Sequence, residues 1–495
     1  MLRGGQMYRK RQNNQMSMFQ EPVNFSGVKL NPQNRWIKMS QLIPWDVIEE
    51  RYSKNFEKSK TGNPAKPARM ALGAHIIKEK LQLSDEETVE AILESPYLQF
   101  FIGLKQFTHK EPFESSTMCW FRKRLTPEML SEVNDYIIGR KVAEEKKDDD
   151  HDNPSGRGSS DKPTEEPVTP ENKGTLILDA TCAPADISFP TDVALLNDGR
   201  EKLEEIIDTL HGAGITDGKK PRTYRKKARK QYLRFARNRK PQKKDIRKAV
   251  KNQLSYVRRD LMHIGKLLSK GGESYLTEKQ KDYLATISTL YEQQKQMYKN
   301  KSHTVEKRIV SIHQPWVRPI VRGKTSAPVE FGSKISISML DGYARIEHLD
   351  WEAYNESTTL IETVERYFDQ TGNYPERVLA DKIYRTRENL KYCETKGIRM
   401  NGPKLGRPPK DKELYRQQCR LEQSEAGERN AVEGKFGEGK RAYNLGRIKM
   451  RLQGTSEAGI HLVFLVMNLE KRLRAFLRLF WDAIYWSWVK QFKMT

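Results

Sequence analysis

Two stretches of this sequence run apolar residues into a single aspartate. One is LILDAT at 176–181, which contains Asp179, and the other is ERVLADKIY at 376–384, which contains Asp381. An aspartate at a strand end often only hydrogen-bonds the turning backbone. A carboxylate at the tip of a core strand is also rigid enough to share a metal ion with other carboxylates. Because the pattern occurs twice, we expect both aspartates to end core strands and to face one another as metal ligands.

A third acid lies in ERNAVEGKFGEGKR at 428–441, which is typical of a helix start. Arg429, Glu433 and Lys440 are spaced by four and seven residues, so they share one helical face. An ordinary surface salt-bridge ladder would have the same spacing. The three glycines of this segment argue against that alternative, because each costs a helix about 1 kcal/mol unless another backbone approaches closely.

Two aspartates and one glutamate among basic residues match the needs of phosphodiester chemistry. In such reactions two divalent ions, about 4 Å apart, hold the attacking and leaving oxygens. Carboxylate ligands suit Mg²⁺ or Mn²⁺. The 495 residues include 89 Lys and Arg against 65 Asp and Glu, a formal net charge of +24. A polyanion is therefore the expected partner.

The densest basic stretch, residues 219–248, holds 16 Lys or Arg against one acid. Such a stretch with interleaved aromatic residues is typical of nucleic-acid binding, although a merely solvated basic face is the simpler alternative. We expect it to contact phosphates through cations that include Arg225, Lys226, Lys227 and Arg229.

Residues 36–140 read as short helices, with a capping box at Ser84 and a helix start at Thr126-Pro127. They suit a helix-turn-helix DNA binder, and they suit another small helical bundle almost as well. Residues 141–173 are rich in Asp, Glu, Ser, Pro and Gly, which predicts a flexible acidic linker. Apolar spacings of four and three over 250–268 and 284–298 predict an antiparallel coiled hairpin of two helices.

Two strands are predicted on either side of Asp341-Gly342, a strong hairpin signal. The longest strongly apolar run, at 462–467, is far shorter than the roughly 20 residues of a membrane helix. The N-terminal segment lacks the pattern of a secretory signal. We therefore expect no membrane contact and a cytoplasmic protein.

Three motifs resemble those of the DDE insertion-sequence transposases. They are LILDATCAP, VLADKIYRTREN and RNAVEGKFGEGKR, in the family's order. The family's third motif, Y-x2-R-x3-E-x6-K, is matched at Arg429, Glu433 and Lys440 and departs at Ala426, where the family has Tyr. Residues 66–125 resemble the helical N-terminal domain of many such transposases. LGRPPKD at 405–411 resembles a minor-groove hook with Arg407 as its reader, and a basic loop that becomes ordered over the DNA is the favoured alternative.

The resemblance implies an RNase H-like (retroviral-integrase-like) core in which Asp179, Asp381 and Glu433 bind two Mg²⁺ or Mn²⁺ ions. Arg429 and Lys440 would grip phosphates beside the scissile bond. The expected partners are double-stranded DNA, as the element's terminal inverted repeats and as target DNA, and a second copy of the chain in a homodimer. The expected location is the bacterial nucleoid.

The expected fold is therefore α/β and multidomain, with a mixed-sheet core interrupted by a basic helical insertion. The expected divisions are a helical N-terminal DNA-binding domain (1–140), a flexible acidic linker (141–173), the first part of the core (174–199), the insertion (200–325), the second part of the core (326–475) and a C-terminal helical tail (476–495). The expected function is cleavage of the element's ends and joining of the 3′ ends to target DNA. A transposase-derived DNA-binding protein without catalysis and a metal-dependent DNA nuclease are the alternatives.

Overall fold

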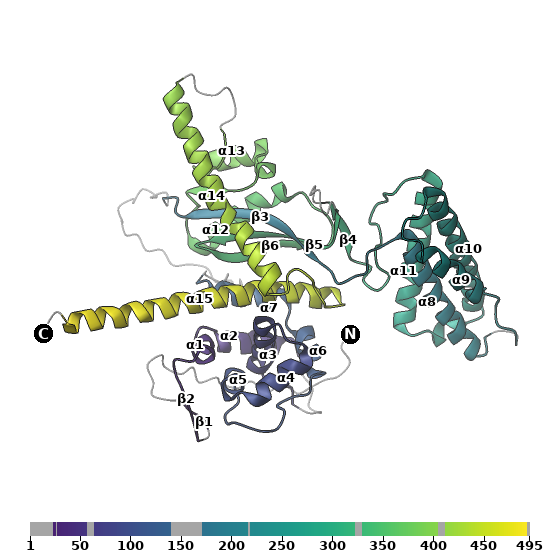
Figure 1. The fold of residues 1–495 in the computed structure, drawn as a ribbon, viewed down its shortest axis with the longest axis horizontal. Helices are drawn as coiled ribbons and strands as arrows, with labels where there is room; N and C mark the ends of the chain where they lie inside the picture. The colour runs from purple at the N-terminus through teal and green to yellow at the C-terminus, as the bar shows by residue number, and fades with distance from the viewer. Residues whose placement is uncertain are drawn as a thin grey trace, which may run out of the picture.

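The computed structural model describes most of the chain (Figure 1). The described residues are 23–25, 27–56, 64–139, 171–215, 218–321, 329–403 and 411–492. The predicted acidic linker lies almost wholly outside them, and so does Arg407. No helix among these residues is long and apolar enough to cross a membrane.

The N-terminal part is a short hairpin followed by seven helices. The hairpin is β1 (Val23–Phe25) with β2 (Val28–Leu30), and the helices are α1 (Arg35–Gln41), α2 (Trp45–Lys54), α3 (Ala68–Leu81), α4 (Asp85–Glu94), α5 (Pro96–Phe101), α6 (Thr117–Arg124) and α7 (Pro127–Ile137). The two predicted helix starts are confirmed. Ser84 forms the capping box of α4 with Glu87, and the Thr126 side chain accepts from the Met129 N–H at the start of α7.

A mixed sheet of six strands follows. Its strands are β3 (Thr175–Pro184), β4 (Arg318–Val321), β5 (Val329–Leu340), β6 (Tyr343–Asp350), β7 (Arg377–Leu379) and β8 (Arg399–Met400). The order is β4-β5-β3-β7-β8, with β6 also paired to β5. β7 is parallel to β3 and to β8, whereas β5 is antiparallel to β3, β4 and β6. The expected α/β class is confirmed.

The predicted hairpin at Asp341-Gly342 is also confirmed. It joins β5 to β6, with Leu340 opposite Tyr343. Asp341 has φ of +52° and Gly342 has φ of +75°. Both values lie in the left-handed region that a tight two-residue hairpin turn requires, which is why these two residue types are a strong signal.

Each face of the sheet is covered by helices. On one face, α12 (Leu360–Thr371) and α13 (Arg387–Thr395) bury a core that contains Leu176, Leu178 and Val378. On the other face lie α14 (Lys412–Ala442) and α15 (Gln453–Phe492). The helix α15 is continuous over 40 residues, so it crosses the expected boundary at 475/476 without a break.

The N-terminal helices α1–α7 do not stand apart from the sheet. Figure 1 shows α15 running between them and the sheet. Their buried residues form one apolar cluster with those of α15 and of β5 and β6. A single core therefore joins the part predicted as a DNA-binding domain to the part predicted as the catalytic core.

The chain between β3 and β4 forms four helices rather than a two-helix hairpin. These are α8 (Asp192–Gly212), α9 (Arg225–Ala236), α10 (Lys243–Leu268) and α11 (Glu278–Asn300), and we call them the four-helix group. The predicted pair, α10 and α11, is present, but α8 contributes as many buried apolar residues to their common core. The hairpin prediction missed α8 because its partner α10 is distant in sequence, beyond the basic α9. Figure 1 shows the group to one side of the sheet.

Buried polar contacts lock the N-terminal helices to the sheet. Arg345 of β6 binds Asp135 of α7 at 2.8 Å and Glu347 at 3.0 Å, and all three side chains are largely buried. Asn468 of α15 donates to the Asn134 side chain at 2.8 Å and to the Ala344 carbonyl at 2.6 Å. The helices α7 and α15 and the strand β6 thus share one polar junction.

Arg345→Met should destabilise the protein strongly. The substitution leaves the buried Asp135 without its ion-pair partner and removes one of the two guanidinium groups that bind the buried Glu347, a loss of about 3–5 kcal/mol in the free energy of unfolding. Chemical denaturation of the full chain measures it. As a control, Lys202→Met breaks the exposed Lys202–Glu205 pair and should cost less than about 1 kcal/mol. Equal losses in the two variants would contradict the locking role of Arg345.

Candidate active site

Asp179 does not end its strand, so that part of the prediction is wrong. The strand β3 continues to Pro184, and Asp179 lies opposite Ile337 of β5. The other edge of β3 pairs with β7, but only from Thr175 to Ile177, so this second pairing ends just before Asp179. The apolar pattern changes at Asp179 because β3 there loses one neighbouring strand, which leaves room for a partly exposed carboxylate.

Asp381 follows β7 on this open edge. In the parallel pair, Leu379 lies opposite Ile177, so each aspartate comes two residues after a matched position. Asp381 caps a short 3-10 turn (Lys382–Tyr384), and its carboxylate accepts from the Lys382 N–H at 2.7 Å. The charge of Asp381 acts on Asp179. The predicted neighbouring strands are therefore confirmed.

Glu433 lies on α14, and the Arg429 side chain connects it to Asp179. The Arg429 Nη1 lies 3.6 Å from Asp179 Oδ2, and its Nη2 lies 3.7 Å from Glu433 Oε1. Arg429 and Glu433 are one turn apart on α14, as predicted, but 428–441 is the C-terminal half of this helix and the predicted helix start there is wrong, because α14 already begins at Lys412. Glu433 is 60% exposed, whereas Asp179 is 16% exposed. Arg429 thus stands between an inner and an outer carboxylate.

The glycines of α14 serve packing only in part. A Cβ on Gly439 would lie 3.0 Å from a Leu445 side-chain carbon and 3.3 Å from the Met467 sulfur. A Cβ on Gly434 would meet nothing within 4 Å. The close approach that we predicted therefore occurs at Gly439, where α14 meets α15, and involves side chains rather than another backbone.

Burial raises the pKa of Asp179 to about 6. The Ala180 N–H at 2.8 Å and the Arg429 guanidinium act in the opposite direction, while the charges of Glu356 and Asp381 raise the pKa further. A carboxylate in such surroundings gains from a nearby cation, because the cation offsets both the lost hydration and the repulsion between acids.

Glu356 is an acid beside the site that sequence reasoning missed. It begins the 3-10 turn Glu356–Thr359, between β6 and α12, and its Oε1 lies 2.9 Å from the Nζ of Lys334 on β5. Both side chains are mostly buried. Glu356 follows no apolar run and lies in no recognisable motif, so only the pairing of β5 with β3 reveals that it lies near Asp179.

The donor chemistry of Asp179, Asp381 and Glu433 fits a hard divalent cation, because all the ligands are carboxylate oxygens. Within the described residues, however, no three His, Cys, Asp or Glu side chains are close enough to hold one ion. Arg429 lies where the Asp179 and Glu433 carboxylates would otherwise approach each other. Metal binding at these acids would therefore require Arg429 to leave them.

The predicted DNA-contacting residues differ in their surroundings. Arg225 binds Asp208 of α8 through two bonds of 2.9 and 2.6 Å, so it holds α9 against α8. Lys226, Lys227 and Arg229 are exposed on α9 and form no ion pair within the described part of the chain. Lys440 is partly exposed near the end of α14.

Comparison with known proteins gives two family matches. The description "Transposase DDE domain" matches residues 378–470, which include Asp381 and Glu433 but not Asp179. The description "Transposase domain (DUF772)" matches residues 26–124, within the N-terminal helices. A protein of Rhizobium meliloti, "Uncharacterized protein ORF8 in nfe locus", is 38% identical over 104 residues, which are 21% of this chain and 49% of the relative. The chain thus spans about half the length of that curated relative. No solved structure matches.

Both matched domains are transposase domains, so the resemblance to the DDE transposases of insertion sequences seen in the sequence is confirmed. Such enzymes act on DNA and generally use divalent metal ions.

Mg²⁺ or Mn²⁺ should raise the melting temperature of the wild-type chain. A ligand that binds only the folded state stabilises it by mass action, by about 2.7 kcal/mol at a concentration 100 times its dissociation constant. The shift should be much smaller in Asp179→Asn and unchanged in the control Glu205→Gln, whose side chain is exposed on α8. Thermal unfolding with and without metal measures it. Equal metal stabilisation in wild type and Asp179→Asn would exclude Asp179 as a ligand.

Neutralising the unpaired cations of α9 should weaken the salt dependence of DNA binding. In K226Q/K227Q/R229Q, the slope of log affinity against log salt should flatten by roughly 0.9 for each phosphate that the variant no longer binds. The matched control K202Q/K281Q/K295Q makes the same charge change in the four-helix group at lysines paired with nearby glutamates. If both triple variants showed the same slope, the net charge of the protein, and not the position of these cations, would determine the salt dependence of DNA binding.

Proposed function

We propose that this chain is an active DNA transposase that cleaves the ends of its mobile element and joins the 3′ ends to target DNA. One observation carries the proposal. Asp179 and Asp381 come from parallel neighbouring strands, and Arg429 links Asp179 to Glu433 on the helix that packs over them. These contacts support a site in which three acids, in the family's order, are gathered beyond the end of the β3–β7 pairing.

The residues have distinct roles in this proposal. Asp179, Asp381 and Glu433 would hold two Mg²⁺ or Mn²⁺ ions, which when bound would polarise the attacking and leaving oxygens of the phosphodiester. Asp179, the most buried of the three, fixes the site to the sheet. Arg429, once released from the carboxylates, can bind a phosphate of the strand being cut, and Lys440 extends this cationic face along α14.

DNA reaches the site along basic surfaces outside it. The unpaired cations of α9 would contact duplex phosphates with little regard for sequence. The N-terminal helices, with Arg407, would contribute recognition of the terminal inverted repeats. Bringing two element ends together calls for a homodimer, because one chain carries one such site. The sheet corresponds in this proposal to an RNase H-like core, and the four-helix group to a basic insertion within it.

Asp179→Asn, Asp381→Asn and Glu433→Gln should each reduce cleavage and joining by about 10²–10³-fold or more, a loss comparable to that of one key electrostatic group. Each substitution removes a metal ligand and leaves the basic surfaces intact, so DNA affinity should change little. The assay uses purified protein, Mg²⁺ and the DNA that flanks its own coding sequence. Near wild-type cleavage in any one variant would remove that residue from the site.

Analysis of the products separates the proposal from its alternatives. A transposase yields element ends joined to target DNA, whereas a nuclease leaves only cut ends. A DNA-binding protein without catalysis yields neither product in the wild type. Joined products that disappear in Asp179→Asn would establish the proposed activity.

A further inference from the structure

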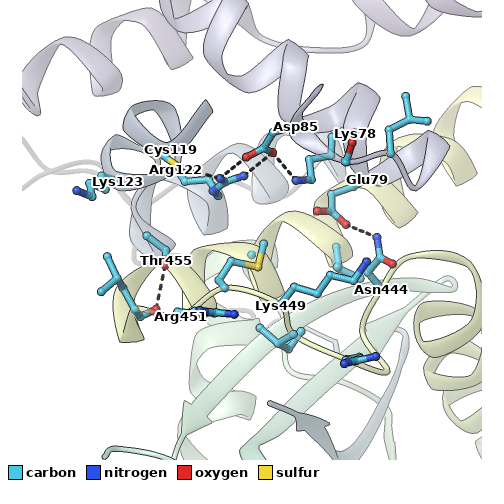
Figure 2. Close-up of a pocket in the computed structure, with 18 of the residues that line it drawn as sticks. Lys78, Glu79, Asp85, Cys119, Arg122, Lys123, Asn444, Lys449, Arg451 and Thr455 are labelled. Atoms are coloured by element: carbon cyan, nitrogen blue, oxygen red, sulfur yellow. Dashed lines mark hydrogen bonds and ion pairs between the residues drawn. The ribbon is translucent and has the colours of Figure 1, made fainter. Parts of the chain in front are cut away.

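A cavity of about 500 Å³ lies where the N-terminal helices meet the connection between α14 and α15. Its lining comes from α3, α4 and α6 on one side and from the connection 443–452 and the start of α15 on the other. Figure 2 shows the side chains of these two walls facing each other. Such a volume is typical of a site for one small molecule or one nucleotide rather than a duplex.

The cations of this cavity fall into two groups. Lys78 and Arg122 are both held by Asp85, and Arg447 binds Asp186 at 2.7 Å. Lys449 and Arg451, by contrast, are exposed and form no hydrogen bond or ion pair within the described residues. Six Lys or Arg line the cavity against three acids: Lys78, Arg122, Lys123, Arg447, Lys449 and Arg451 against Glu79, Asp85 and Glu86. The connection therefore presents to an anion two exposed cations that form no ion pair within the described residues, and the charge of Lys449 also acts on Glu79.

The inner wall is different in character from this cationic rim. Apolar side chains line much of it, namely Leu83, Ile448, Met450 and Val463. One hydrogen-bonding pair adjoins them. Glu79, which is 3% exposed, accepts from the Asn444 amide at 3.2 Å. Figure 2 shows this pair at one end of the cavity, with Lys449 beside it. A cationic rim above apolar walls with a polar edge suits a phosphate attached to a flat heterocycle.

The cavity is also connected to the catalytic elements. The Ile448 N–H donates to the Pro184 carbonyl at 2.8 Å, and the Asp186 N–H donates to the Ile448 carbonyl at 3.0 Å. The connection therefore extends the end of β3, the strand of Asp179. Its other end continues from α14, the helix of Glu433. A group bound in the cavity is thereby fixed relative to both acids.

We propose that this cavity holds one unpaired nucleotide of the DNA substrate, with its phosphate between Lys449 and Arg451 and its base against the apolar wall. The inference rests on the proposed function, since it takes DNA as the substrate. Extruding a base from a duplex costs a few kcal/mol, so an unpaired strand should enter most readily. Burial of the base and two charge contacts offset that cost.

Fluorescence anisotropy with a short single strand and the matching blunt duplex tests the proposal on the full chain. In K449Q/R451Q, affinity for the single strand should fall about tenfold, and its log-salt slope should flatten by roughly 0.7 for each of the two cations removed. Affinity for the duplex should change less than about threefold. The control K281Q/K295Q makes the same charge change at paired lysines on α11 and should alter neither.

Each other outcome overturns the inference. Unchanged single-strand binding in K449Q/R451Q would exclude the cavity as a DNA site, and equal losses for both DNAs would mean a plain phosphate contact without an unpaired nucleotide. If the wild type cleaves DNA in an Asp179-dependent manner while K449Q/R451Q binds normally, only this inference fails. If the wild type binds no DNA at all, the proposed function fails with it.

Cys119 provides a second readout, because it is exposed and lines the cavity. Cys182 and Cys393 are buried, so Cys419→Ser leaves Cys119 as the accessible thiol of the described residues. Saturating single-stranded DNA should slow maleimide labelling of Cys119 several-fold. In K449Q/R451Q, saturating single-stranded DNA should leave the rate of labelling unchanged. Protection by a free deoxynucleoside monophosphate but not by the DNA strand would assign the cavity to a free nucleotide and overturn the proposal.

Discussion

The structure depends on burial of α15 between two layers. The middle of this helix is apolar on nearly every side, and it packs against the N-terminal helices on one face and against the sheet on the other. If either neighbouring layer were missing, a helix that is apolar on all sides would expose apolar side chains to water. Both layers must therefore be present for it to be stable. The buried Asn468 and the Arg345–Asp135 pair then fix the orientation of these layers.

This arrangement limits how far the acidic side chains of the candidate site can move relative to one another. The helix α14 packs against β3 and β7 at its middle and against α15 near Gly439. Glu433 can therefore shift relative to Asp179 only as far as α14 can move on this support. Arg429 is the adaptable part, because its long side chain can leave the two carboxylates without any movement of the backbone.

Local patterns predicted the local features well. Ser84, Thr126 and the Asp341-Gly342 turn each act within a few residues, and the shared face of Arg429 and Glu433 follows from helical spacing alone. The order of acids along the chain also suffices to propose Asp179, Asp381 and Glu433 together.

Features that depend on pairing between segments distant in sequence were not predicted. Asp179 looks like a strand end because its apolar run stops, but the cause is the departure of β7 rather than the end of β3. The same limit explains Glu356, which lies near Asp179 because β5 pairs with β3 and carries Lys334, and no spacing within residues 350–360 indicates this. The helix α8 is recognisable as amphipathic, but its partner α10 begins some 30 residues later, beyond the highly basic α9. Sequence patterns specify faces of elements, whereas the choice of partner depends on the whole fold.

The position of α15 has a consequence for synthesis on the ribosome. The N-terminal helices emerge first, yet part of their apolar surface is completed only by α15, the last described helix to be made. The strand β3 likewise emerges long before β5, its longest partner. Until then the nascent chain exposes apolar surface and an unpaired strand edge, both of which favour aggregation. The four-helix group, whose core is built from its own residues and the adjoining segments, can fold in the meantime. A chain cut short before α15 would therefore be a target for chaperones and proteases.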